Sequence, residues 1–229
     1  MQESKPMSKS FNVVIATAGR PSLQTMIDSI APQLTERDYL TIIWDSLPFA
    51  VKLDTNANVI QIVNPEPLGY WGHGSRTRWQ NELPGDYLMN ADDDDIYLPD
   101  SMEVIREHSV DQKLYVFKIY HGGFVVPLSD EIRVGNIGTP CGVYPNTGEL
   151  PEWPFVYGGD GMFYESLAKQ LPVEFIDRVI YAVKGEIGQR EKEEPPSDLI
   201  CKCGGRMTEI SVGGKASVIC VSCRREIEL

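Results

Sequence analysis

The sequence predicts an α/β fold, a mostly parallel sheet sandwiched by helices, followed along the chain by a small β module. Short apolar runs alternate with amphipathic segments through residues 11–183, which is typical of right-handed βαβ units. Several of these runs end abruptly in polar turns. Beyond them, a charged stretch with two prolines precedes four of the five cysteines, which indicates a linker and a separate module.

The chain divides into four predicted parts. Residues 1–10 are polar and predict a disordered tail, and residues 11–187 hold all the long apolar runs. Residues 188–198 are the expected linker, and residues 199–229 are the cysteine-containing module.

Composition narrows the function classes. The 229 residues carry a formal net charge of −12, which disfavours nonspecific binding to nucleic acid or to anionic membranes. No apolar run approaches the ~20 residues that span a bilayer, and the N-terminus lacks the apolar stretch of a signal peptide. We therefore expect a cytoplasmic protein with no integral membrane segment and no nucleic-acid partner.

The first strands and helix follow from apolar spacing. The run FNVVIA at 11–16 stops at a turn-like segment and predicts a buried parallel strand. Segment 23–34 has apolar residues at helical spacing behind Ser22, a favourable N-cap. The runs YLTIIW and NVIQIV predict strands at 39–44 and 58–63.

The later elements are predicted in the same way. Glycine-rich turns and prolines separate them, and the strands are rich in β-branched and aromatic residues. They are helices at 75–82, 98–108 and 158–171, strands at 86–91, 113–120 and 173–183, and a long loop or hairpin region at 121–150.

Four consecutive aspartates follow the predicted strand 86–91. Ligands of open α/β sheets bind outside the carboxyl ends of the strands, although a solvated acidic turn is the simpler alternative. On an extended chain, Asp92 and Asp94 point the same way and suit one Mg²⁺ or Mn²⁺ ion. Asp93 with Asp95 is the competing pair, and Asp95 could also contribute through a water.

Several segments together carry a family resemblance. In order, they are VVIATAGRPSL, IIWDS, GHGSRTRWQNELPGDYLMNADDDDIYLPDSM and GGDGMF. This ordered set resembles family 2 glycosyltransferases of the GT-A fold over roughly residues 11–183. The resemblance implies a metal-dependent enzyme that moves a sugar from a UDP- or GDP-linked donor to a hydroxyl, with inversion. The acceptor would be a glycan, a lipid or a protein.

The resemblance also implies roles for residues of the donor site. Thr17 and Arg20 match the turn that lines the nucleotide pocket in the family. Asp45 matches the carboxylate that hydrogen-bonds the base, and Arg76 matches the arginine near the diphosphate. Arg78 is the alternative to Arg76.

Within the aspartate cluster, the resemblance assigns Asp92 and Asp94 to the metal and the ribose. Asp95 becomes a supporting metal ligand, and Asp93 is placed with Asp92 on the substrate side. The ion would be Mn²⁺ or Mg²⁺, which neutralises charge on the leaving nucleoside diphosphate.

The acceptor side is expected around Asp160, which matches the position of the family's general base. The family often has an acid before this residue, whereas this chain has Gly159, so Glu152 is kept in reserve. A helix N-cap is the structural alternative for Asp160. The other residues expected to face the acceptor are those of the loop 135–139 and the aromatics Trp153, Phe155 and Tyr157.

The C-terminal cysteines predict a structural Zn²⁺ site. Four thiolates suit tetrahedral zinc, and the two β-rich stretches around Gly213-Gly214 indicate a hairpin. The pattern resembles a zinc ribbon, while disulfides or a redox dithiol are the alternatives. The expected ligands are Cys201, Cys203, Cys220 and Cys223.

Two other functions stay open from the sequence. A nucleotidyltransferase can share this sheet and its metal-binding carboxylates, but it would be expected to have a glycine-rich basic loop after the first strand. A sugar-nucleotide or glycan-binding module without turnover is the alternative outside the enzymes.

Overall fold

A computed structural model describes residues 9–183, 207–212, 215–220 and 226–228. Contacts within the chain divide it into two units, 1–187 and 188–229. Each unit has a sheet of its own. Among the described residues, no helix combines the length and the apolar character that crossing a bilayer requires.

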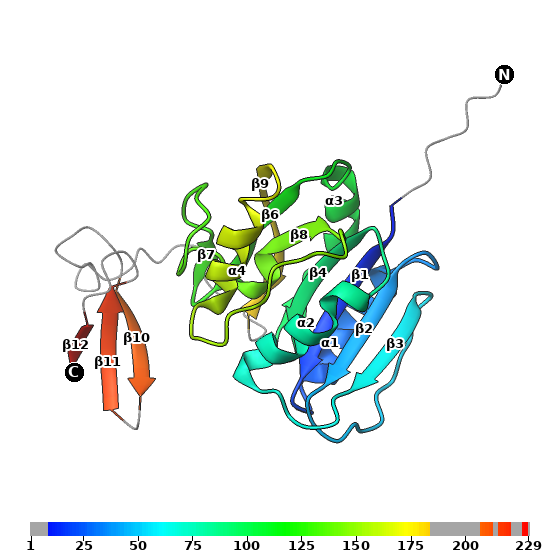
Figure 1. Ribbon diagram of the computed structural model, residues 1–229, viewed down its shortest axis with the longest axis horizontal. Helices are drawn as coiled ribbons and strands as arrows, with labels where there is room; N and C mark the ends of the chain where they lie inside the picture. Colours follow the sequence, from blue (N-terminus) through cyan, green and yellow to red (C-terminus); the bar gives the residue numbers. More distant parts are fainter. Residues whose placement is uncertain (1–8, 184–206, 213–214, 221–225, 229) are drawn as a thin grey trace. The chain divides into compact units, whose positions relative to one another are not determined.

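The first unit is built on a nine-stranded sheet in the order β3-β2-β1-β4-β8-β6-β9-β5, with β7 paired to β6 (Figure 1). Its first half is parallel, because each connection returns the chain to the edge of the sheet at which the previous strand began. These strands are β1 (Phe11–Thr17), β2 (Tyr39–Trp44), β3 (Asn58–Val63) and β4 (Tyr87–Asp92).

The second half of the sheet is mixed. The short strand β8 (Gly142–Pro145) runs antiparallel to both β4 and β6 (Leu114–His121). Strand β9 (Val173–Ala182) is parallel to β6, while β5 (Ile96–Tyr97) and β7 (Phe124–Val126) are antiparallel additions. Because β8 is reversed, β4 and β6 point the same way. The carboxyl ends of β1, β2, β4, β6 and β9 therefore lie at one edge of the sheet.

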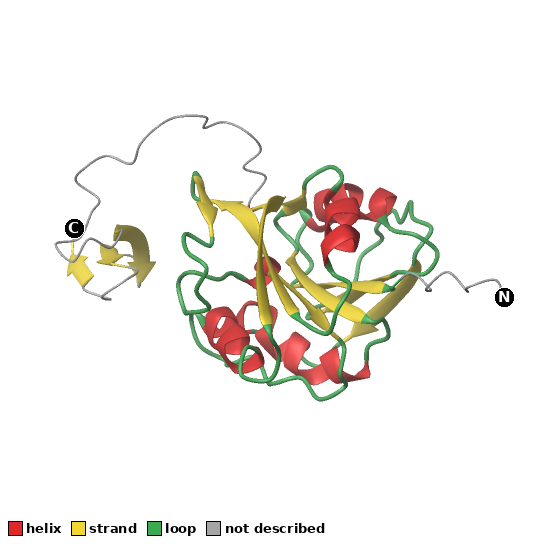
Figure 2. Ribbon diagram, turned by 90° about the horizontal axis from the view of Figure 1, so that it is seen from above, coloured by secondary structure: helices red, strands yellow, loops and turns green. Residues whose placement is uncertain are grey.

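Helices cover both faces of the sheet (Figure 2). The α-helices are α1 (Leu23–Ile30), α2 (His73–Trp79), α3 (Ser101–His108) and α4 (Gly159–Leu167). Four 3-10 turns supplement them, namely η1 (Ala31–Gln33), η2 (Tyr70–Gly72), η3 (Gln80–Glu82) and η4 (Thr139–Cys141).

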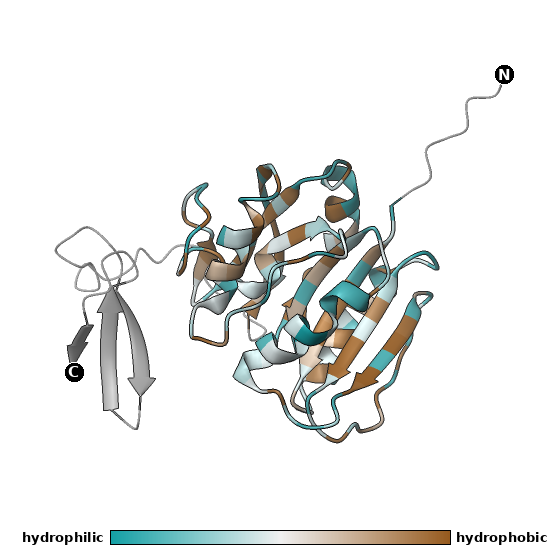
Figure 3. Cartoon of the chain, in the orientation of Figure 1, coloured by the Kyte–Doolittle hydropathy of each residue, from teal (hydrophilic) through white to brown (hydrophobic). Residues whose placement is uncertain are grey.

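Helix α2 differs from the other helices in its hydropathy. Figure 3 shows it as hydrophilic beside strands with long apolar stretches, yet His73, Gly74, Ser75 and Arg76 are buried. Burying polar groups is costly unless they are partnered. The position of α2 therefore points to a polar site beneath it.

Most predicted elements are confirmed, with differences at their ends. The strands at 39–44 and 58–63 match β2 and β3 residue for residue. The helix expected over 23–34 ends at Ile30, where Pro32 shifts the chain into the η1 turn. Ser22 makes no side-chain cap hydrogen bond.

The region 121–150 differs most from expectation. It contributes a hairpin strand, β7, and also the central strand β8, which was not predicted. At the other end of the unit, residues 1–8 of the expected tail lie outside the described residues. Ser10, which we placed in that tail, donates to Asp86 Oδ2 from its backbone N at 2.8 Å and from its hydroxyl at 3.0 Å.

The second unit is a three-stranded antiparallel sheet in the order β10-β11-β12. Strands β10 (Met207–Val212) and β11 (Lys215–Cys220) form the predicted hairpin, with Val212 opposite Lys215. Strand β12 (Glu226–Glu228) pairs with β11. Of the four expected zinc ligands, Cys201, Cys203 and Cys223 lie outside the described residues, and Cys220 ends β11.

Candidate active site

A pocket of about 180 Å³ lies where β4, β6 and β9 end. Four carboxylates line it, three from the end of β4 and the segment after it and one from the first turn of α4: Asp92, Asp94, Asp95 and Asp160. The other lining residues are Ile119, His121, Gly138, Thr139, Pro140 and Val183. The chain therefore brings together acids that are far apart in sequence, at the sheet edge where α/β folds bind ligands.

The aspartate cluster is a turn and not an extended segment. Asp92 is the last residue of β4, and Asp93 and Asp94 form a turn before β5. The alternation that we expected from an extended chain therefore does not apply. The turn still separates the acids, because the side chains of Asp92 and Asp94 are 34% and 31% exposed whereas that of Asp93 is 5% exposed.

Asp93 is held by residues at the end of β1 and in the turn that follows it. Thr17 Oγ1 donates to Asp93 Oδ2 at 2.6 Å, and Arg20 Nη1 lies 3.2 Å from Asp93 Oδ1 and 2.7 Å from Asp94 Oδ2. Burial raises the pKa of Asp93, while the Thr17 hydrogen bond and the Arg20 charge oppose that rise. Asp93 is absent from the pocket lining, so its role is to hold the turn through Thr17 and Arg20.

Arg76 anchors the other side of the turn. Its side chain is fully buried, and Nη2 donates to Asp92 Oδ1 at 2.7 Å and to the Ala91 carbonyl at 2.9 Å. Nη1 donates to the Trp71 carbonyl at 3.1 Å. Arg78, the alternative from the sequence, is exposed and lies over the Trp79 ring. The buried arginine of α2 is thus paired with an acid of the aspartate cluster, which offsets the cost of burying its charge.

Asp45 lies outside the pocket lining. Its Oδ1 accepts hydrogen bonds from Asn64 Nδ2 at 2.8 Å and from the Leu68 backbone at 2.6 Å. Its Oδ2 accepts one from the Gly69 backbone at 2.6 Å. Asp45 therefore fixes the loop that leads into η2, and one oxygen keeps further acceptor capacity.

Asp160 is the second residue of α4, behind an N-cap at Gly158 whose φ is 76°. It is thus not the N-cap that we considered as an alternative. Its Oδ1 accepts a hydrogen bond from the Gly161 backbone at 2.8 Å. Burial raises the pKa of Asp160, which the charges of His73 and Arg76 only partly offset.

The glycine before Asp160 has a steric reason. A Cβ at Gly159 would lie 2.2 Å from the Pro154 carbonyl oxygen and 2.9 Å from the His73 ring. Any side chain there would force the backbone apart, so no second acid fits beside Asp160. Glu152, the reserve candidate, is exposed and absent from the pocket lining.

His121 was missed by the sequence analysis. It ends β6 and lines the same pocket as the aspartates. The rule that ligands bind at the carboxyl ends of parallel strands would have found it, because we had placed a strand end at residue 120. The two glycines that follow His121 indicate a loop, so the residue was assigned to the loop and not to the strand end.

The acids do not form a ready-made metal cage. Within the described ranges, no group of three or more His, Cys, Asp or Glu side chains is arranged to hold a metal ion. The donor chemistry nevertheless suits a hard cation, because Mg²⁺-type sites commonly use one or two carboxylates together with substrate phosphates and waters. Asp92 and Asp94, which face the pocket, meet that requirement.

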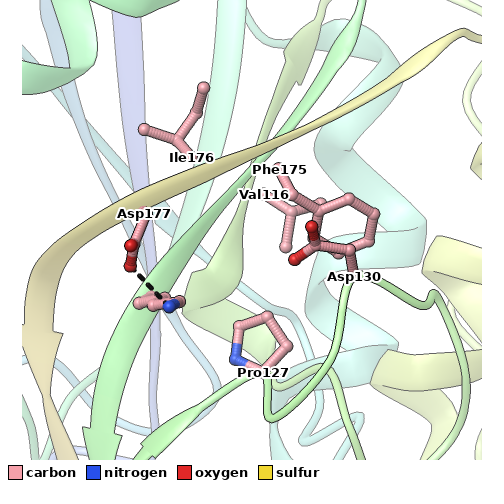
Figure 4. A pocket seen from close by; sticks show the side chains of 7 residues that line it. Val116, Pro127, Asp130, Phe175, Ile176 and Asp177 are labelled. Atoms are coloured by element: carbon pink, nitrogen blue, oxygen red, sulfur yellow. Dashed lines mark hydrogen bonds and ion pairs between the residues drawn. The ribbon is translucent and has the colours of Figure 1, made fainter.

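A second hollow lies beside the register shift between β6 and β9 (Figure 4). Val116, Pro127 and Phe175 form apolar walls, and Lys118 Nζ pairs with Asp177 Oδ1 at 2.5 Å. The pair joins the two strands where their backbone register slips, which gives it a structural role. No acid cluster comparable to the aspartate turn lines this hollow.

The fold is shared with solved structures. Crystallised S. aureus TarS 1-349 matches with a TM-score of 0.57 and 16% identity, covering 76% of this chain and 60% of that one. Its complex with UDP-GlcNAc matches with a TM-score of 0.53 and 14% identity, covering 82% and 63%. The mannosyltransferase PcManGT from Pyrobaculum calidifontis, in complex with GDP-Man and Mn²⁺, matches with 0.57 and 11% identity, covering 81% and 59%.

These likenesses establish the fold, and the chain spans less than two thirds of the length of each of these three structures. No family model matches the sequence. No curated protein matches it either.

Proposed function

We propose that this protein transfers a sugar from a nucleoside-diphosphate sugar to an acceptor hydroxyl. The observation that carries the proposal is the pocket in which Asp92 and Asp94 meet Asp160. The fold supports it, because the same architecture occurs in proteins crystallised with UDP-GlcNAc and with GDP-Man and Mn²⁺. A hexosyl donor linked to UDP or GDP is the proposed substrate.

Asp92 and Asp94 are the proposed holders of a divalent cation, with Asp95 in support. When bound, Mn²⁺ or Mg²⁺ would neutralise charge on the diphosphate of the donor. In the structure, Arg20 and Arg76 balance the carboxylates of Asp94 and Asp92. These arginines reduce the repulsion between the acids, and Arg20, which is half-exposed, is also proposed to contact a phosphate of the donor.

The proposed reaction is a single displacement. The acceptor oxygen attacks C1 of the sugar while the bond from C1 to the phosphate oxygen breaks, and the nucleoside diphosphate leaves with that electron pair. The hydroxyl proton passes to the carboxylate of Asp160, and C1 is inverted. The burial that raises the pKa of Asp160 makes it a stronger base than an exposed aspartate, and such a base contributes roughly 10²–10⁴-fold.

The base and ribose are proposed to lie toward β1 and β2. On that side, Thr17 is hydrogen-bonded to Asp93. Asp45 Oδ2 accepts one hydrogen bond and retains capacity to accept another from a base N–H. We expect these residues to affect donor affinity more than the transfer step, because none of them reaches the pocket lining.

Residues 199–229 are proposed to form a separate zinc-stabilised module, which the linker 188–198 joins to the first unit. Four thiolates would supply stability that about 30 residues rarely obtain from a core alone. Elemental analysis of the full chain should find about one zinc per chain. Cys220→Ser should lose it, and Cys141→Ser, at a buried cysteine of the first unit, should keep it. A metal-free wild-type chain would contradict the proposal.

Donor binding tests the main proposal. Thermal unfolding should be measured with UDP-, GDP- and TDP-sugars, each with and without Mn²⁺. A donor that binds the folded state raises the midpoint, and we expect one nucleotide to do so only with the metal. Asp94→Asn should abolish that metal-dependent rise, because it removes a proposed ligand.

Asp177→Asn is the matched control, since its side chain is 89% exposed and lies in the other hollow. It should respond like the wild type. A shift that ignores Mn²⁺, or that persists unchanged in Asp94→Asn, would reject the metal-binding role. No shift with any donor would reject the proposed function.

A further inference from the structure

Four exposed aromatic side chains lie together on the two segments that lead into α2 and α4. Tyr70 and Trp71 come from η2, and Phe155 and Tyr157 come from the loop before α4; we call them the aromatic platform. Their exposed fractions are 53%, 64%, 48% and 81%. Tyr70 stacks on Phe155 with ring centroids 5.0 Å apart, and Trp71 meets Tyr157 edge to face at 6.2 Å.

The backbone under the platform is strained. Tyr70 and Trp71 both have φ of 54°, a left-handed conformation that is unfavourable for residues other than glycine. Such a conformation persists only where its surroundings impose it. Here the Trp71 carbonyl accepts from Arg76 Nη1, and the same guanidinium donates to Asp92. Through Arg76, the backbone that carries these two exposed rings is therefore connected to the aspartate turn.

The other half of the platform is joined to the proposed base. Residues 155–157 directly precede α4, and the Gly159 backbone donates to the Val156 carbonyl at 3.0 Å. Asp160 is the next residue. Only Gly158 and Gly159 separate Tyr157 from Asp160 along the chain.

We propose that the aromatic platform binds the acceptor, and that the acceptor is a neutral carbohydrate. The inference rests on the proposed function, in which the hydroxyl must approach Asp160. Flat aromatic rings offer large contact area with little loss of side-chain freedom, and they match the flat C–H faces of pyranose rings. The tyrosine hydroxyls add hydrogen-bonding groups. A chain with a net charge of −12 disfavours a polyanionic acceptor.

Trp71 gives the proposal a direct readout. Of the four tryptophans, Trp44 and Trp153 are buried and Trp79 is half-buried, so Trp71 is the one that is largely exposed. The expectation that Trp153 faces the acceptor is therefore wrong. Adding a neutral oligosaccharide to the full-length protein should change the tryptophan emission, because a ring that stacks on Trp71 displaces water.

The test uses an array of neutral hexose, N-acetylhexosamine and pentose oligosaccharides, followed by fluorescence titration of those that bind. Tyr157→Ala should weaken binding roughly tenfold or more, the value expected when one stacking ring is lost. Tyr157 is the most exposed ring of the platform, so its truncation spares the core. Phe49→Ala is the matched control, since Phe49 is 40% exposed and lies outside the platform.

The donor experiment runs in parallel and separates the two proposals. Tyr157→Ala should keep the metal-dependent midpoint rise with the donor sugar. If that rise is lost while saccharide binding stays, the platform serves the donor and this inference fails. If the wild type binds donor but no saccharide on the array, or if Phe49→Ala weakens saccharide binding equally, the inference fails and the proposed function stands. Absence of any donor response fails the proposed function itself.

Discussion

The two edges of the central sheet treat buried acids in opposite ways. At the amino edge, Asp38 precedes β2 and is fully buried. At the carboxyl edge, Asp160 lies at the pocket beside the aspartate turn. Both are removed from water, which alone would raise a carboxyl pKa. Their hydrogen-bond partners decide whether each pKa rises or falls.

Asp38 is surrounded by donors. Arg106 donates with two nitrogens, at 3.1 and 2.6 Å, and Thr35 donates from its backbone and its hydroxyl, both at 2.7 Å. The Phe11 backbone adds a bond at 3.1 Å. Burial works to raise the pKa of Asp38, but the hydrogen bonds outweigh it and the pKa is lowered. This acid stabilises the fold.

Asp160 has fewer partners. In the part of the chain that the structure describes, its carboxylate accepts a hydrogen bond only from the Gly161 backbone. Burial therefore prevails, and the pKa of Asp160 is raised. The comparison teaches that partnering, more than burial, separates acids that hold a fold from acids that remain able to take up a proton.

The largest expected effect is on turnover at the carboxyl edge. Asp160→Asn should lower transfer by roughly 10²–10⁴-fold, because an amide cannot accept the hydroxyl proton. The measurement is release of nucleoside diphosphate, with water or a saccharide as acceptor, alongside the donor-induced midpoint rise, which should persist. Asp130→Asn, at an exposed acid of the second hollow, should retain wild-type turnover. If Asp160→Asn keeps its transfer rate, Asp160 is not the base.

The next effect is on stability at the amino edge. Asp38→Asn should lower the free energy of unfolding by about 3 kcal/mol, because it leaves Arg106 without its counter-ion and turns an amide group toward donors. Denaturant unfolding measures this change. Asp54→Asn is the control, since Asp54 is 84% exposed and surface ion pairs contribute about 0–1 kcal/mol. Equal stability of the two variants would refute the structural role of Asp38.

The smallest expected effect is on how the unfolding midpoints of the two variants depend on pH. A raised folded pKa means that ionised Asp160 costs stability at neutral pH, so Asp160→Asn should unfold at a higher temperature than the wild type. That gain should vanish as the pH falls below the ordinary carboxyl range. The lowered folded pKa of Asp38 gives the reverse: the deficit of Asp38→Asn should be full at neutral pH and shrink as the pH falls through the folded pKa. If, at neutral pH, the midpoints of both variants shift in the same direction relative to the wild type, the comparison is contradicted.

Much of the sheet was predictable because its strands are apolar and end abruptly. The runs at β2 and β3 fix their own limits, and the glycine turn fixes the start of α4. Strand β8 could not be predicted in this way. Its four residues, GVYP, are too short to show a period and include two residues that disfavour strands, so pairing with β4 and β6 alone makes them a strand.

The candidate site was predictable in its residues more than in its geometry. The acids at 92, 94, 95 and 160 do share a pocket, and Arg76 contacts the cluster. The turn at Asp93 depends on Thr17 and Arg20, which are distant in sequence. The steric role of Gly159 depends on the Pro154 carbonyl. Such long-range contacts leave no local signal.

Strand β8 also has a consequence for how the protein assembles. The strands β3, β2, β1 and β4 are complete once residue 92 has been synthesised, but β8, which joins them to β6, lies at residues 142–145. One edge of β4 therefore stays unpaired while some fifty residues are added to the chain. Pairing β8 with this edge then requires closing a long loop. We expect insertion of β8 to limit the folding rate and to close the edge that would otherwise favour aggregation.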